Sequence, residues 1–189
     1  MYTILVNIIR KTIQLFLGKF GFKIQKNLSK DSLNGLFLKR FEDSVKFSSK
    51  KIEFFLTLEN ILNYICLNRI EGDIAECGVF KGANCRFICN YLVEKNNKIK
   101  SIYLYDTFEG MPEASADDTN ISTKKNYNYY LKNFKKNSSL NNFYRYEDIF
   151  NVKNNVISTN YDESKIHFIK GLVENTIPQN IPKKICLVI

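Results

Sequence analysis

The pattern of apolar residues changes character near residue 72. Before it, apolar positions recur at helical spacing in residues 5–20 and 51–68. After it, short apolar runs alternate with helical segments. This alternation predicts an α/β fold with one parallel, doubly wound sheet. The expected strands are residues 73–77, 101–106, 166–170 and 185–189, and the helices between them are residues 83–94 and 147–159.

The last expected strand, residues 185–189, reads ICLVI without a polar position. A continuous apolar run is typical of a parallel strand that is covered on both faces. We therefore expect this strand to be buried on both sides.

The chain divides by composition into an N-terminal helical and linker segment, residues 1–50, and an α/β domain, residues 51–189. Residues 27–50 are polar and are expected to hold a short helix. Residues 111–146 form a long polar, Tyr-rich insertion between two strands. Such an insertion lies above the carboxyl ends of the strands, where open α/β sheets bind ligands. It is either a lid over an active site or a solvated surface excursion.

The N-terminal segment carries an apolar stripe at helical spacing, with basic residues on or near its other face. Arg10 interrupts the apolar runs, so we do not expect a transmembrane span. Two interpretations remain open. The helix packs on its own domain or on a second copy of the chain, which would make a homo-oligomer. Alternatively, it lies on an anionic membrane, at the inner face of the cell membrane.

Net charge is +9, which would suit a polyanionic partner. Nucleic-acid binding usually recruits Arg for its bidentate hydrogen bonds. Only five of the 28 basic residues are Arg, so we predict no nucleic-acid partner. The Lys-rich composition instead resembles the product of an AT-rich genome.

The five cysteines are an odd number in a chain without a clear secretory signal: Cys66, Cys77, Cys85, Cys89 and Cys186. They are expected to be reduced, mostly buried thiols of a cytoplasmic protein. A zinc site would need a fourth ligand, and His167 is the only His and lies far away in the sequence. We expect no metal ligand among them.

Two neighbouring strands each end in an acid, Glu76 and Asp106. After Glu76, Gly78 allows a tight turn, and Gly82 would let the next helix begin close to a ligand. An acid at the end of the second strand can accept hydrogen bonds from ribose hydroxyls. Together these residues indicate a pocket for a nucleoside with a polar arm. The alternative is that Asp106 only caps a turn.

Three segments carry a family resemblance in the right order: Glu71-Gly-Asp-Ile-Ala-Glu-Cys-Gly-Val-Phe-Lys-Gly82, Tyr105-Asp-Thr-Phe-Glu-Gly-Met-Pro112 and His167-Phe-Ile-Lys-Gly-Leu-Val-Glu-Asn-Thr-Ile-Pro178. They resemble the macrocin O-methyltransferase family, which includes sugar O-methyltransferases of macrolide and aminocoumarin pathways. The resemblance covers roughly residues 50–189. It implies a Rossmann-like methyltransferase sheet flanked by helices, which uses S-adenosylmethionine and magnesium.

The resemblance also implies a role for each matching residue. Glu76, Gly78 and Gly82 would line the methionine end of the cofactor. Asp106, Thr107 and Phe108 would hold the ribose and adenine side, with Gly171 near the adenine. One departure is that Ala83 and Asn84 stand where the family usually has Gly-Ser. The third segment is expected to form a strand followed by a turn that ends in Thr-Ile-Pro.

The family's next strand runs into an Asp-x-Asp stretch that is implied to bind the metal and supply the general base. The sequence ends at Ile189, so we expect the sheet to be incomplete after the fourth strand and the magnesium ligands to lie beyond it. No catalytic residue is assigned within the chain. The two interpretations are a sugar or glycan O-methyltransferase and a truncated remnant that at most binds a nucleoside or partner subunits. We expect residues 1–189 alone to be inactive, which a transfer assay with tritiated S-adenosylmethionine would test.

Overall fold

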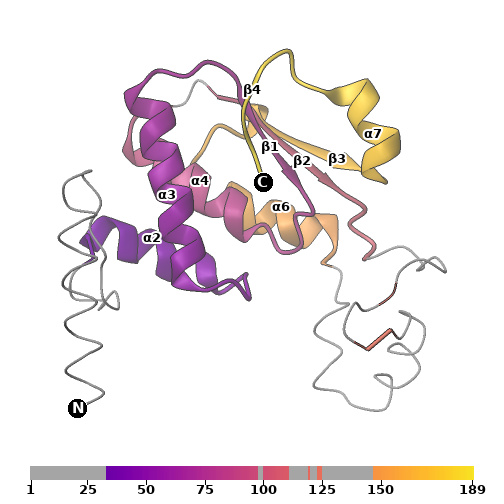
Figure 1. Cartoon of the computed structure of the whole chain (residues 1–189), viewed down its shortest axis with the longest axis horizontal. Helices are drawn as coiled ribbons and strands as arrows, with labels where there is room; N and C mark the ends of the chain where they lie inside the picture. Colours follow the sequence, from indigo (N-terminus) through magenta and orange to yellow (C-terminus); the bar gives the residue numbers. More distant parts are fainter. Residues whose placement is uncertain (1–32, 98–99, 111–118, 120–122, 125–146) are drawn as a thin grey trace, which may run out of the picture. The chain divides into compact units, whose positions relative to one another are not determined.

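The computed structural model describes residues 33–97, 100–110, 119, 123–124 and 147–189 (Figure 1). The expected helix in residues 5–20 and nearly all of the insertion at residues 111–146 lie outside these residues. The chain divides into two compact units, Met1–Leu38 and Lys39–Ile189, and the second holds the α/β domain. Among the described helices, none combines the length and the apolar character that a bilayer crossing requires.

Four strands form one sheet in the order β3-β2-β1-β4, and every neighbouring pair is parallel. The strands are β1 (Asp73–Cys77), β2 (Ile102–Asp106), β3 (Ile166–Lys170) and β4 (Ile185–Val188). The predicted single parallel sheet is therefore confirmed. In this register Glu76 lies beside Leu104, and Asp106 lies beside Lys170.

The helices predicted from apolar spacing form at nearly the expected bounds. They are α3 (Ile52–Leu67), α4 (Ala83–Glu94) and α6 (Ile149–Ile157). The short helix expected in the polar segment is α2 (Gly35–Val45), and a 3-10 turn, η3 (Glu163–Lys165), precedes β3. Asp148 begins α6 because its side chain accepts a hydrogen bond from the Phe150 N–H.

The turn predicted for the segment after β3 is wrong. The structure has a helix there, α7 (Val173–Asn180), with Pro178 inside it. Proline removes one backbone donor and usually interrupts a helix, which is why the sequence did not indicate one. Tertiary contacts stabilise it: α7 packs on β2 and β3, and the Tyr105 hydroxyl donates to the Asn180 carbonyl at 2.8 Å.

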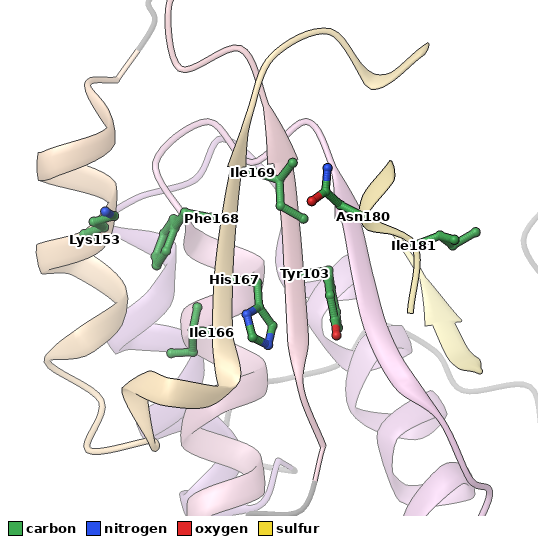
Figure 2. Close-up of a pocket in the computed structure, with 8 residues that line it drawn as sticks. All are labelled: Tyr103, Lys153, Ile166, His167, Phe168, Ile169, Asn180 and Ile181. Atoms are coloured by element: carbon green, nitrogen blue, oxygen red, sulfur yellow. The ribbon is translucent and has the colours of Figure 1, made fainter. Parts of the chain in front are cut away.

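One layer of helices is built from α3, α4 and α6, with α3 against α4 and α4 against α6 (Figure 1). The side chains that α3 buries recur at helical spacing, and α4 is buried over most of its length. Figure 2 shows β3 between Lys153 of α6 and Asn180 at the end of α7. The sheet therefore has helices on both of its faces at this edge.

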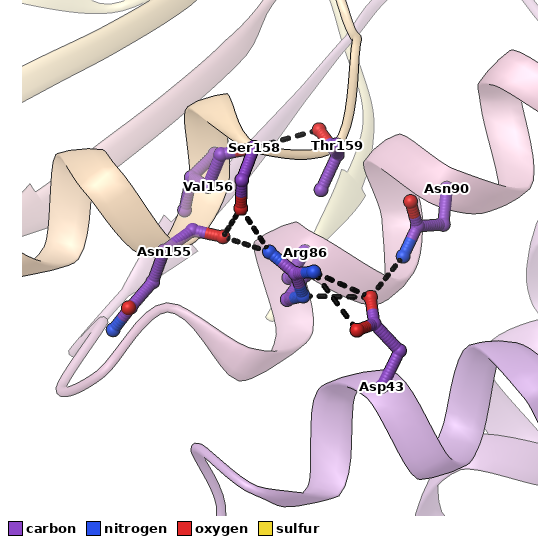
Figure 3. A network of polar contacts seen from close by, with 7 residues as sticks. All are labelled: Asp43, Arg86, Asn90, Asn155, Val156, Ser158 and Thr159. Carbon is purple, nitrogen blue, oxygen red and sulfur yellow. Dashed lines mark hydrogen bonds and ion pairs between the residues drawn. The ribbon is translucent and has the colours of Figure 1, made fainter.

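A partly buried arginine joins three helices (Figure 3). The Arg86 side chain on α4 forms two hydrogen bonds with Asp43 of α2, from Nε at 2.7 Å and from Nη2 at 2.9 Å. Its Nη1 donates to the Ser158 hydroxyl at 2.5 Å and to the Asn155 carbonyl at the end of α6. The Arg86 hydrogen bonds hold the pKa of Asp43 below its usual value, against the opposing effect of burial, which is the largest single influence. The network fixes α4 against its neighbours.

Two expectations about burial were wrong. β4 is not covered on both faces, because Ile185 is 37% and Val188 63% exposed in the part of the chain that the structure describes. Two of the five cysteines, Cys85 and Cys89, are buried, whereas Cys77 is exposed. All five thiols are free. An apolar run thus predicted the strand correctly but not the covering of its faces.

Candidate functional site

The turns that follow β1, β2 and β3 are joined at the carboxyl edge of the sheet. The Gly78 N–H, just after β1, donates to the Tyr105 carbonyl of β2 at 2.9 Å. The Gly171 N–H, just after β3, donates to the Asp106 carbonyl at 3.0 Å. Because parallel strands end at the same edge, Glu76, one residue before the end of β1, and Asp106, at the end of β2, come together there with the turns.

Glu76 is the deepest polar side chain at this edge, with 1% of its surface exposed. One carboxylate oxygen, Oε1, accepts a hydrogen bond from the Asn84 amide at 2.7 Å. Within the described residues, Oε2 is buried without a donor, and so is Asn84 Oδ1 without a partner. Burial raises the pKa of Glu76 to about 7, and the nearby Asp106 adds to the rise. The Asn84 hydrogen bond, the Lys50 charge and the backbone N–H of Cys85 oppose it.

The two glycines of the first turn differ in what surrounds them. Gly78 has a φ of +85°, and a Cβ placed on it would meet no atom within 4 Å. Gly82 has a φ of +81°, and its Cβ would lie 2.9 Å from Val156 Cγ2 and 3.3 Å from Val152 Cγ1 of α6. Glycine at position 82 is therefore needed for the packing of α4 on α6, a reason that the sequence does not indicate.

The carboxylate of Asp106 accepts hydrogen bonds from backbone N–H groups of the protein itself. Oδ2 accepts hydrogen bonds from the Val79 N–H at 2.6 Å and the Phe80 N–H at 3.1 Å. Oδ1 accepts from the Phe108 N–H at 2.8 Å. The side chain therefore joins the turn after β1 to the loop after β2.

The other predicted residues, in the loop after β2 and in the turn after β3, are also held by local contacts. The Thr107 hydroxyl donates to the Gly110 carbonyl at 2.5 Å. Phe108 has a φ of +51° and is 3% exposed, with its ring 6.3 Å from that of Phe168. Gly171 has a φ of +141°, and a Cβ there would lie 2.8 Å from Thr176 Cγ2 of α7. The structure thus brings all seven predicted residues to one edge of the sheet.

Lys50 is a further charged residue near this site that no sequence motif indicated. Lys50 lies just before α3, its charge acts on the Glu76 carboxylate, and its ammonium lies 3.9 Å from the centre of the Phe54 ring. It stands 26 positions before Glu76, outside the three recognised segments. Only the folded chain brings the two together.

Residues 53–189 match the family Macrocin-O-methyltransferase (TylF). The chain belongs to the macrocin O-methyltransferase family. A curated relative, the mycinamicin III 3''-O-methyltransferase of Micromonospora griseorubida, is 24% identical over 113 residues. That match covers 58% of this chain and 39% of the relative, so the chain matches about two fifths of the relative's length.

Among solved structures, the O-methyltransferase NovP is similar with a TM-score of 0.55 and 17% identity. The likeness covers 77% of this chain and 60% of NovP. At this identity it supports the fold, and it agrees with the parallel sheet and flanking helices described above.

The first two macrocin O-methyltransferase segments surround the site of Glu76 and Asp106, whereas the third also borders a hollow at the edge strand. That hollow, of about 580 Å³, borders β3 (Figure 2). It is lined by Tyr103, Lys153, Ile166, His167, Phe168, Ile169, Asn180 and Ile181. None of the seven predicted residues lines it. The ring centres of Tyr103 and His167 lie 4.5 Å apart there, with 34° between the ring planes.

The magnesium that the family resemblance implies gains no support from the described residues. They contain no group of three or more His, Cys, Asp or Glu side chains placed to hold a metal ion. Magnesium thus remains an expectation from the resemblance.

Proposed function

We propose that this protein is an S-adenosylmethionine-dependent O-methyltransferase that acts on a sugar hydroxyl of a secondary metabolite or a surface glycan. The observation that carries the proposal is the buried Oε2 of Glu76, which has no donor in the described chain. A carboxylate oxygen without a donor is costly at this depth. An ammonium group of a ligand would donate a hydrogen bond to this oxygen.

The residues at this edge fit the cofactor. Glu76 Oε2 is a buried acceptor for the ammonium of the methionine part, and no atom lies within 4 Å of the place that a Cβ on Gly78 would take. Asn84 Oδ1 is a second acceptor without a partner in the described chain. When bound, S-adenosylmethionine supplies a methyl group on a sulfonium centre for transfer to an acceptor oxygen. The role of the described residues is to bind and orient it.

The sugar acceptor is proposed from the relatives. The relative from Micromonospora griseorubida is named as a methyltransferase of mycinamicin III, acting at a 3'' oxygen. The sequence resemblance points to the same class of acceptor. A surface glycan would be modified by the same chemistry, and purified acceptors of both kinds would separate the two sources.

We predict that binding of the cofactor depends on Asp106. We expect the Asp106 carboxylate to accept hydrogen bonds from the ribose hydroxyls, and a hydrogen bond to a charged group contributes about 1.5 to 3 kcal/mol. An Asp106→Ala substitution should therefore weaken binding of S-adenosylhomocysteine roughly ten- to a hundredfold. Calorimetric titration of both proteins would measure the change. Equal affinities would remove Asp106 from the site.

Several expectations remain proposals beside this one. They are a lid at residues 111–146, a homo-oligomer or membrane contact through the N-terminal helix, magnesium, and an inactive remnant as the alternative function. Because the chain matches only 39% of its curated relative, the methyl transfer is proposed for the whole protein. Cofactor binding can be tested on residues 1–189.

A further inference from the structure

A second hollow lies at the amino edge of the sheet, at the opposite end of the strands from Glu76 and Asp106. It has a volume of about 710 Å³. Three segments border it: the end of α3 with the loop that leads to β1, the residues before β2, and the residues before β4. None of the seven residues predicted to bind the cofactor lines it. This amino-edge hollow is therefore separate from the candidate functional site.

Positive charge dominates the wall of the amino-edge hollow. The lining includes four cationic side chains and two carboxylates: Arg69, Lys100, Lys183, Lys184, Glu71 and Asp73. Glu71 is already neutralised, because its Oε2 pairs with Lys184 Nζ at 2.5 Å. Asp73 Oδ1 accepts a hydrogen bond from the Ser101 N–H at 2.8 Å. The wall thus keeps an excess of cations after its own acids have found partners.

Lys100 is the buried cation of this wall, with 8% of its surface exposed. Its ammonium donates to the Ile70 carbonyl at 2.9 Å and to the Gly72 carbonyl at 2.8 Å, and it lies 3.4 Å from Cys186 Sγ. The ion pairs formed among the described residues do not include Lys100. Burying a charge is costly unless an opposite charge accompanies it. The ammonium has hydrogen-bond acceptors here but no counter-charge.

Arg69 and Lys183 are two exposed cations of the same wall. Neither takes part in an ion pair within the part of the chain that the structure describes. Cations gathered on the wall of a hollow attract anions into it. A guanidinium and an ammonium are the groups with which proteins most often bind phosphoryl oxygens.

We propose that the amino-edge hollow binds the phosphoryl group of a small phosphorylated molecule. Lys100 supplies a fixed positive charge in its wall, and Arg69 and Lys183 donate hydrogen bonds to the phosphoryl oxygens. Ile65 and Ile70 also line the hollow and offer an apolar surface to an organic part of the ligand. The inference does not depend on the proposed function, because the two sites lie at opposite edges of the sheet.

The test is calorimetric titration of residues 1–189 with pyrophosphate, at constant ionic strength and with S-adenosylhomocysteine in excess. We expect binding at a single site. Arg69→Gln combined with Lys183→Gln should weaken this binding roughly tenfold or more, because both donors to the phosphoryl oxygens are lost. Lys39→Gln combined with Lys46→Gln is the matched control. It removes the same charge from exposed positions in and just after α2, and should change the affinity by less than about twofold.

A second measurement locates the ligand. Cys66 lines the amino-edge hollow, whereas Cys77 is an exposed thiol at the carboxyl end of β1. Bound pyrophosphate should slow the alkylation of Cys66 by iodoacetamide and leave that of Cys77 unchanged. Mass spectrometry of the two peptides would measure both rates.

Titrations with inorganic phosphate and with adenosine 5'-diphosphate separate a site for free phosphate from a site for an organic phosphate. Binding of either compound that depends on Arg69 and Lys183 supports the inference. Failure of the unchanged, folded chain to bind any of the three compounds would overturn it. Equal losses of affinity in the two double variants, or protection of Cys77 in place of Cys66, would overturn it as well. None of these outcomes bears on the proposed function.

Discussion

A Glu76→Gln substitution is expected to stabilise the ligand-free chain at pH 8 while it removes most of the affinity for the cofactor. Burial raises the pKa of the Glu76 carboxyl from 4.5 to about 7, which corresponds to about 3 kcal/mol. Below about pH 4.5 the carboxyl is protonated in both the folded and the unfolded chain. As the pH rises to about 7, the unfolded chain loses the proton first, so the free energy of unfolding falls.

Glutamine cannot ionise and therefore lacks this loss of stability. At pH 8 the Gln variant should be more stable than the unchanged chain by up to about 3 kcal/mol, and at pH 4.5 the difference should disappear. Cofactor binding should change in the opposite direction. Without the charge that would meet an ammonium group, the affinity for S-adenosylhomocysteine at pH 8 should fall roughly tenfold to a hundredfold or more.

Thermal melts at pH 4.5 and pH 8, together with calorimetric titration at pH 8, would measure both effects. Glu163→Gln serves as the control, because Glu163 is an exposed carboxylate in η3. A melting difference that is the same at both pH values would show that Glu76 is not the group whose pKa is raised. Binding sites commonly keep a charged group that a ligand needs, although that group lowers the stability of the ligand-free chain.

Replacing Arg40 by Ala should cause a large loss of stability. The Arg40 side chain is 4% exposed and pairs with Glu59 of α3 at 2.6 Å and with Glu94 at the end of α4. Its guanidinium also lies 5.4 Å from the centre of the Tyr91 ring. Removing it leaves two carboxylates without their cation and a cavity between three helices. We expect the free energy of unfolding to fall by about 3 kcal/mol. The loss should be smaller than for an ion pair with fully buried partners, because Glu94 is partly exposed.

Such a loss should lower the melting temperature by roughly 6 to 12 °C in a domain of this size. Lys39→Ala is the matched control, because Lys39 is exposed on the same helix and its removal should change the melting temperature little. An Arg40→Lys variant should fall between the two, since one ammonium cannot reach both carboxylates as a planar guanidinium does. Equal melting temperatures for Arg40→Ala and Lys39→Ala would contradict the interpretation.

The sequence by itself determined the elements and their order. Apolar periodicity is a local property, so β1, β2, β3 and the helices α3, α4 and α6 could be predicted at nearly their observed bounds. The acids and glycines at the ends of β1 and β2 could be predicted to meet, because parallel strands end at one edge. The family resemblance added an expected role for each of those residues in binding the cofactor.

Only the tertiary structure decided what those residues contact. The helix α7 forms despite Pro178 because it packs on β2 and β3, and a local pattern cannot register that packing. Gly82 faces Val156 of α6, which lies 74 positions later in the sequence. Burial raises the pKa of Glu76, and the Asp106 carboxylate accepts hydrogen bonds from the Val79 and Phe80 N–H groups. Burial and hydrogen-bond partners arise from segments distant in the sequence, so composition and spacing could not supply them.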